Sequence, residues 1–501
     1  MLLNSFKFFV VFIFVFLLFW AIPSKFKKIQ KWYLIVVSYA LYVNFQPWFA
    51  LILMFVTLIT YFGARVIERY SSPRNDLSSD DVSYQERKSA EEAKNIKLRK
   101  FLGIGFAVLA LMPLLSFKYY NFITQLIHDG LKHVGLYFDI PGLNWAIPVG
   151  ISFFTFQALG YYLDVYRGKE RAERSFSDYV LFCSFFPQIA SGPISTASEL
   201  MPQIKNEKKF VFNHGVEGLK YVLWGIVLKC VFADRLGLYV DTVFGNYDHF
   251  SGMNCALAAF FFTLQIYGDF AGYSLMAIGI AKTLGFHLVN NFNRPYFADS
   301  VTTFWRRWHI SLTRWLTTHV YIPLGGSHCS KPRQYANIMT TFLVSGLWHG
   351  ANYTFILWGG MHGVAQIAEK SLGIDPKGKH ANKKWLLKMK PLRIIVTFIF
   401  VTIAWIFFRM PTLTDAWNLI TRIFSDHTSQ SFMYKATNTD KLLTFFAIML
   451  VFMAELRAEY LKEKFKWLDN SWARWMIYIS LFVIILILGV LDSGSFIYVN
   501  F

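Results

Sequence analysis

Long apolar runs separated by basic stretches extend along the whole chain. Two examples are FKFFVVFIFVFLLFWAI at positions 6–22 and WMIYISLFVIILILGVL at positions 475–491, which together contain one charged residue, Lys7. A helix needs about 20 predominantly apolar residues to cross the hydrocarbon core of a bilayer. A soluble core of this length would show charge breaks or amphipathic periodicity. The pattern therefore predicts a membrane protein with many crossing helices.

The apolar pattern predicts an all-α polytopic membrane protein with about 11–13 transmembrane helices. Two further apolar stretches, 177–196 and 298–322, are interrupted by Pro, Gly or charged residues and predict re-entrant or interfacial helices. The expected spans are 6–22, 32–46, 48–67, 101–121, 146–165, 213–233, 253–270, 271–286, 335–349, 351–369, 393–409, 441–456 and 473–491.

Basic segments between the apolar runs predict the orientation. The segment KFKKIQK at 25–31 and the polar stretch 69–100 flank two spans joined by a short turn, so both lie on one face, the cytosolic one. The basic stretches 383–393 and 456–467 are assigned to the same face, and the last span then leads outward. We expect a single membrane domain over 1–501, with a cytosolic loop at 69–100 and both termini on the outer face.

Composition narrows the class of partner. The net charge is +19 and only 16% of residues are charged, against 55% hydrophobic. In a membrane protein, this excess of Lys and Arg favours cytosolic loops over nucleic-acid binding. It is also compatible with a cytosolic entrance that attracts an anionic, phosphate-bearing donor. The four cysteines are scattered and form no CxxC, so neither a disulfide framework nor a metal site is expected.

The clearest candidate chemistry lies in SGLWHGANYTFILWGGMHG at 345–363, which holds His349 and His362 and no charged residue. An ionisable side chain inside a membrane span is a functional-site hypothesis by default, and imidazole accepts a proton near neutral pH. The alternative for each is a structural histidine hydrogen-bonded between helices. Gly346 and Gly350 beside His349 would allow close approach of a backbone or a ligand.

A second aromatic and basic segment, DSVTTFWRRWHISLTRWLTTHVYIPLGG, occupies 299–326. It is typical of an interfacial helix with an aromatic belt and snorkelling arginines. The sharper alternative is the mouth of a cavity, with His309 near the reaction centre and Arg306, Arg307 and Trp308 binding a phosphate-bearing donor. On the residue pattern alone the first interpretation is favoured.

Taken together, several ordered motifs resemble the membrane-bound O-acyltransferases. They are PVGISFFTFQ, FFPQIASGPI, DFAGYSLMAIGIAKTLGF, FWRRWHISLTRWL, YIPLGG and the segment 345–363. The similarity covers about 145–410 and is greatest to the bacterial branch of alginate O-acetylation proteins, peptidoglycan O-acetyltransferases and the teichoic-acid D-alanylation membrane protein. It implies a multi-helix funnel whose thin centre joins a cytosolic cavity to an outer one.

The resemblance also implies roles for individual residues. The histidine of WHG, here His349, would be the essential catalytic residue, and His309 in RRWHIS a second histidine near the reaction centre. His362 is expected to pack between helices. Asp269 and Tyr273 lie in a motif typical of the family, where a buried structural acid is the expected role.

The tail FIYVNF at 496–501 resembles an F-[IV]-Y-x-x-F motif found in this branch. The resemblance implies that Tyr498 accepts the acyl group as a covalent intermediate on the outer side. A phenol has a pKa of about 10 and a thiol of about 8.5, so a phenyl ester keeps much of the transfer potential of a thioester. The alternative is an aromatic anchor at the outer interface.

These features predict an O-acyltransferase in the bacterial inner membrane. It would move an acetyl group from cytosolic acetyl-CoA outward for O-acetylation of an extracytoplasmic polysaccharide, with no permanently bound cofactor. No region resembles the hydrolase-like enzyme that acetylates the sugar, so a separate outer-face SGNH-hydrolase-like partner is expected. Two alternatives are a transporter or flippase of a lipid-linked substrate and an acyltransferase of this family that acts on a lipid or protein.

Overall fold

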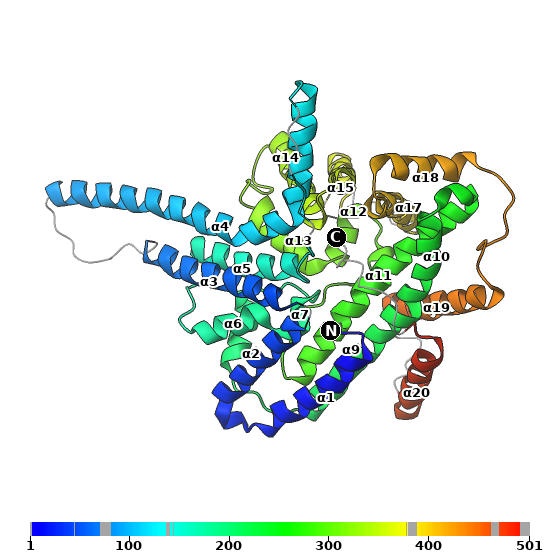
Figure 1. Ribbon diagram of the computed structural model, residues 1–501, viewed down its shortest axis with the longest axis horizontal. Helices are drawn as coiled ribbons and strands as arrows, with labels where there is room; N and C mark the ends of the chain where they lie inside the picture. The colour runs from blue at the N-terminus through cyan, green and yellow to red at the C-terminus, as the bar shows by residue number, and fades with distance from the viewer. Residues whose placement is uncertain are drawn as a thin grey trace. The chain divides into compact units, whose positions relative to one another are not determined.

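The computed structural model describes residues 3–44, 46–70, 82–136, 141–143, 145–376, 378, 388–461 and 470–490, although not the side chains within 82–94. In this part of the chain all regular elements are helical (Figure 1). The all-α class predicted from the apolar runs is therefore confirmed.

The chain divides into two compact units. The first comprises most of residues 11–211 together with 284–288, and the second comprises the segment before position 11 with 212–283 and 289–490. The first unit contains most of α1 (Phe6–Ala21) and the helices α2 (Lys27–Val43), α3 (Pro47–Arg69), α4 (Val82–His133), α5 (Ile151–Tyr166), α6 (Phe176–Ser184), α7 (Phe186–Ile189) and α8 (Ala197–Lys205).

The second unit holds the candidate site. Its α-helices are α9 (Phe212–Ile226), α10 (Asp234–Phe244), α11 (Gly252–Thr283), α12 (Val301–Arg307), α13 (Ile310–Leu316), α14 (Lys331–His349), α15 (Tyr353–Ser371), α17 (Lys390–Arg409), α18 (Leu413–Ser425), α19 (Asn438–Leu456) and α20 (Ser471–Leu488). Three short π-helical segments continue α9, α13 and α19: η2 (Val227–Ala233), η5 (Thr317–Tyr321) and η6 (Arg457–Leu461). Such segments are rare and are often found at functional sites.

In the described part of the chain, five helices are individually long and apolar enough to span a membrane: α3, α4 from Asn95, α11, α17 and α20. The bent pair formed by α1 and Ser24–Val43, which meet at 104°, could supply a sixth span. The larger number of crossings predicted from the sequence also counts shorter or more polar helices such as α5 and α14.

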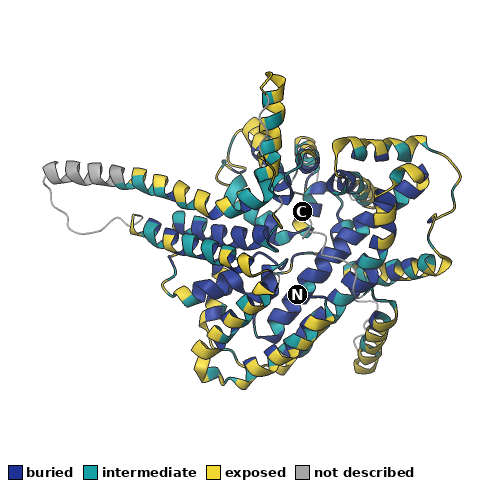
Figure 2. Ribbon diagram, viewed as in Figure 1, coloured by how far each residue is buried: buried dark blue, intermediate teal, exposed yellow. Residues whose placement is uncertain are grey.

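The helix α11 corrects one detail of the prediction. The sequence predicts two spans, at 253–270 and 271–286, but α11 is one uninterrupted helix from Gly252 to Thr283. A glycine within it permits close packing on a neighbouring helix, because a Cβ on Gly272 would lie 2.7 Å from the backbone oxygen of Gly225 in α9. Figure 2 shows α11 buried along much of its length, whereas α20 is largely exposed, as expected for a helix facing lipid.

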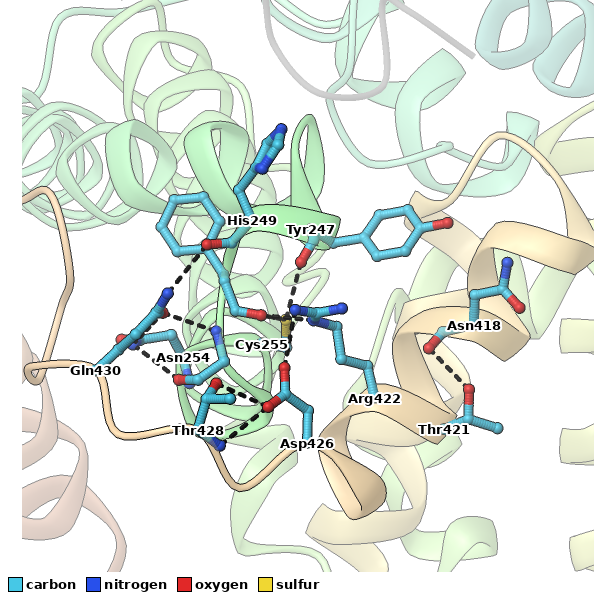
Figure 3. Close-up of polar contacts among 12 residues, drawn as sticks. Tyr247, His249, Asn254, Cys255, Asn418, Thr421, Arg422, Asp426, Thr428 and Gln430 are labelled. Carbon is cyan, nitrogen blue, oxygen red and sulfur yellow. Dashed lines mark hydrogen bonds and ion pairs between the residues drawn. The ribbon is translucent and has the colours of Figure 1, made fainter.

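The start of α11 is held by a polar cluster that involves the end of α18 (Figure 3). Arg422 Nε donates to the backbone oxygen of Phe250 at 2.6 Å, and the Gly252 backbone N–H donates to the Asp426 carbonyl at 3.2 Å. The side chain of Gln430 accepts from the Ser251 N–H at 2.7 Å. Since the first N–H groups of a helix have no partner within it, these contacts satisfy the helix end and fix its position.

Candidate functional site

The helices α14 and α15 form a tight pair because glycines lie where they cross. A Cβ on Gly346 would stand 2.2 Å from the backbone oxygen of Phe355, and one on Gly359 would stand 2.3 Å from that of Phe342. No side chain fits at such distances. The sequence predicted that Gly346 would allow a backbone or a ligand to approach closely. In the structure it is the backbone of the neighbouring helix α15 that does so.

His349 is the last residue of α14 and is only 2% exposed. Its ring contacts Trp358 of α15 edge-on, with 5.0 Å between centroids, and Phe408 of α17 at 5.2 Å. The adjacent Trp348 also packs edge-on against it at 4.7 Å. The imidazole therefore lies in an aromatic shell built by three helices, where water is scarce and each polar interaction is strong.

His362 and His349 both contact Trp358, whose ring centroid lies 5.0 Å from that of each histidine. The Trp305 indole N–H donates to His362 Nδ1 at 3.2 Å. Because an indole can only donate, Nδ1 carries a lone pair and the proton of the neutral ring lies on Nε2. His362 is fully buried among aromatic rings, the environment expected of a histidine packed between helices.

His309 lies at the break between α12 and α13 with φ of +41°, in the left-handed region. Such backbone is uncommon outside glycine and often marks functional sites. The side chain is fully buried, and its ring packs 5.9 Å from that of Trp348, the neighbour of His349. Both predicted catalytic histidines thus contact the same tryptophan.

The tautomer of His309 follows from its partner. Asn291 Oδ1 accepts from both the backbone N–H and the hydroxyl of Ser311, at 3.2 and 2.9 Å, which identifies it as the oxygen. His309 Nδ1 lies 3.1 Å from this oxygen and must donate to it, so Nε2 carries the lone pair. Burial lowers the pKa of His309 to about 3. The ring, which lies outside the candidate spans, is therefore neutral at physiological pH.

The three residues predicted to bind the donor, Arg306, Arg307 and Trp308, lie in different surroundings. Arg306 lines a cavity, whereas Arg307 Nη1 pairs with Glu459 at 3.0 Å and donates to the Arg294 carbonyl at 3.3 Å. Trp308 is fully buried; its ring is stacked 5.5 Å from that of Phe304 and lies tilted 5.1 Å from that of Trp405. Of the three, Arg306 is the one placed to meet a ligand in this cavity.

This cavity, the Arg306 pocket, has a volume of about 360 Å³. It is enclosed by α12, α13, η5, α14, α15 and the segment after α15, and carries Arg306 and Lys370 as cations and Asp375 as an acid. Ser345 of α14 also lines it, one helical turn before His349. Four residues of helix rise by about 6 Å, so Ser345 in the pocket lining and His349 are about 6 Å apart along the axis of α14. His349 itself is not part of the lining.

A buried ion cluster joins the π-helix η2 to α11. Lys229 Nζ lies 2.7 Å from Asp234 Oδ1 and 2.5 Å from Asp269 Oδ1, and all three side chains are less than 10% exposed. Nearby, Tyr273 donates its hydroxyl to Asn4 Oδ1 at 2.8 Å. Asp269 is thus a buried acid, as the sequence suggested, and its principal partner is a lysine that the sequence analysis passed over.

Replacing Lys229 with methionine should destabilise the protein strongly, because it leaves two buried carboxylates without their cation. Breaking a buried ion pair from one side typically removes about 3–5 kcal/mol. We expect a clear fall in the thermal unfolding temperature of the detergent-solubilised protein, with the exposed Lys209→Met as control. Adding Asp234→Asn and Asp269→Asn should restore part of the loss. Unchanged unfolding of the single variant would contradict this role for the cluster.

Tyr498 and the tail 492–501 lie outside the described residues. Their predicted position on the outer face stays a prediction.

Comparison with known proteins adds the decisive observation. Residues 169–413 match the membrane-bound O-acyltransferase family. The chain carries a domain of this family. The matched region contains all three histidines described above, and the resemblance inferred from the motifs is confirmed.

Named relatives fall in the branch that the motifs indicated. The chain is 37% identical over 332 residues to a probable alginate O-acetylase of Pseudomonas aeruginosa, covering 66% of this chain and 62% of that protein. It is 37% identical over 301 residues to a peptidoglycan O-acetyltransferase of Helicobacter pylori, covering 55% and 56%. A teichoic acid D-alanyltransferase of Bacillus subtilis is 24% identical over 324 residues, covering 62% and 78%. The match thus spans about three fifths of the first two relatives.

Proposed function

We propose that this protein transfers an acetyl group from cytosolic acetyl-CoA, across the inner membrane, for O-acetylation of an extracytoplasmic polysaccharide. The observation that carries the proposal is the position of His349. It is a buried imidazole one helical turn from a cavity with two cationic side chains, Arg306 and Lys370. The names of the relatives, an alginate O-acetylase and a peptidoglycan O-acetyltransferase, support acetyl as the group and a polysaccharide as the final acceptor.

The donor would enter through the Arg306 pocket. Arg306 and Lys370 match the charge of the CoA phosphates, which themselves cannot enter the hydrocarbon core. The thioester end would extend past Ser345 towards His349. Arg307 and Trp308 would not contact the donor directly, since Arg307 is held by Glu459 and Trp308 is fully buried beside His309 in the sequence.

The transfer balances without a cofactor. His349 removes the proton of an attacking hydroxyl as its oxygen bonds to the acetyl carbonyl carbon. The carbon–sulfur bond then breaks, and the proton passes from His349 to the CoA thiolate. The lone pair on His309 Nε2 would orient the hydroxyl or the protonated imidazole.

The hydroxyl that we propose as first acceptor is that of Tyr498. A phenyl ester on the outer tail remains activated, so a second enzyme can pass the acetyl group on to a sugar. That enzyme would be a separate SGNH-hydrolase-like acetyltransferase on the outer face, where we also place both termini.

A bulky side chain at position 345 should block the path between the pocket and the imidazole. Ser345→Phe is expected to lower kcat/KM for acetyl-CoA by about 100-fold or more, because small displacements of a reacting group have effects of that size. Ser345→Ala is the matched control. It should retain activity, since the Ser345 hydroxyl has no hydrogen-bond partner among the described residues. Full activity of a folded Ser345→Phe protein would place the donor path elsewhere.

The function itself is tested by release of CoA. Purified protein in lipid nanodiscs is supplied with acetyl-CoA, and free thiol is followed with a chromogenic reagent. We expect thiol release that exceeds the rate without protein and requires His349. A transporter or flippase would release none, and that result would reject the proposed reaction.

A further inference from the structure

A second cavity in the same unit has no part in the proposed reaction. It measures about 260 Å³ and is bounded by η2, α11, the short helix η4 (Pro295–Phe297), α17 and α19. Twelve of its fourteen lining residues are apolar or aromatic, leaving one arginine and one glutamate. We call it the α19 pocket. Its wall includes Phe232, Leu264, Phe398, Ile448, Val451 and Phe452.

The two charged residues of the α19 pocket are already partnered. Arg294 Nε lies 2.6 Å from Glu459 Oε2, and Glu455 Oε1 accepts from the Tyr267 hydroxyl at 3.1 Å. Both contacts lie towards the C-terminal end of α19 and the following η6. The remaining wall offers only hydrocarbon and ring surface. A ligand that fits this wall is therefore an uncharged chain, not a phosphate or a sugar.

The surroundings of the pocket identify the source of such a chain. Two of its helices, α11 and α17, are candidate membrane spans. Next to the lining residues, α17 and α19 carry large apolar side chains that are exposed on the protein surface. Among them, Ile395 is 55% exposed and Met449 is 39% exposed. Surfaces of this kind face lipid in a membrane protein. The molecules next to the pocket are therefore phospholipids, and their acyl chains have the chemistry that its wall accepts.

We propose that the α19 pocket binds one acyl chain of a membrane phospholipid. The chain would lie along α19 from Ile448 towards Glu455, with the head group beyond the partnered charges. Seven residues of helix span about 10 Å, the length over which α19 contributes to the wall. This inference does not depend on the proposed acetyl transfer.

The bound chain would lie close to the catalytic region. The inner wall of the pocket includes Tyr267 and Tyr296, whose rings pack 6.4 and 6.2 Å from that of Trp308. Trp308 directly precedes His309. An acyl chain would thus support, from the lipid side, the aromatic layer behind this histidine.

Photo-crosslinking in nanodiscs tests the proposal. The full chain is reconstituted with a phosphatidylcholine that carries a diazirine on one acyl chain, irradiated, and mapped by mass spectrometry. We expect adducts on inward-facing lining residues, Ile448 and Val451 among them. Ile448→Trp, which fills the pocket from a half-buried position, should lose most of these adducts. The neighbouring Met449→Trp, on the exposed side, should keep them.

Two results would overturn the proposal. The first is that adducts in the unmodified protein are confined to exposed positions such as Ile395 and Met449. Such adducts would report only the general lipid-facing surface, and this result needs no variant to fold. The other is an Ile448→Trp protein that elutes normally in size exclusion and is still labelled at Val451 as strongly as the unmodified chain.

Discussion

Replacing His349 with glutamine is expected to lower CoA release and polysaccharide acetylation by about 10²–10⁴-fold, the usual contribution of a general base. Glutamine keeps polar atoms and most of the volume inside the aromatic shell of Trp348, Trp358 and Phe408, so the fold should persist. The smaller His349→Ala should be equally inactive. Thiol release by purified protein and ester-linked acetate on cell-surface polymer provide the two measurements.

The exposed His427→Gln provides the control, because it removes an imidazole from the surface and should leave both activities unchanged. Fold is checked by size-exclusion elution and thermal unfolding. If the His349 variants acetylate polymer like the unmodified protein, the buried imidazole is structural and the mechanism proposed for it is wrong.

Changing Tyr498 to phenylalanine removes one oxygen and should abolish acetylation of the polysaccharide. A phenyl ring without a hydroxyl cannot form an ester, while its aromatic surface is retained. Acetate released from the polymer by mild base should fall to the level of cells that lack the protein. Tyr434→Phe, at an exposed tyrosine between α18 and α19, should have no effect.

The same experiment separates the two hypotheses for the tail. An aromatic anchor at the membrane interface needs only the ring, so normal acetylation by Tyr498→Phe would leave the tail as an anchor and remove the proposed acyl carrier.

Much of the fold could be predicted because apolar runs determine where helices form. The predicted span 393–409 corresponds to α17 and the predicted span 441–456 to α19. The division of α11 was wrong for a physical reason. An apolar run does not by itself show whether a helix is interrupted. Here Gly272 packs against α9 and Asp269 pairs with Lys229, so the helix continues through both positions.

The residues of the candidate site that lie in sequence motifs could be predicted as candidates. His349 and His309 stand out in the sequence, and their shared contact with Trp348 brings them together. Three features could not be predicted, because they depend on tertiary structure. They are the left-handed backbone of His309, the tautomer that Asn291 imposes on it, and the different surroundings of the adjacent residues Arg306 and Arg307. Lys229 is different, because a lysine inside the apolar run 213–233 is itself a signal that sequence analysis could have used.

The proposed route through His349 and Tyr498 can be tested by locating the acetyl group on the protein. Purified protein is incubated with acetyl-CoA carrying an isotopically labelled acetyl group, quenched in acid, digested and mapped by mass spectrometry. We expect a labelled ester on Tyr498 in the unmodified chain and none in His349→Gln. Release of CoA without any label on Tyr498, or equal labelling in the His349 variant, would contradict this route.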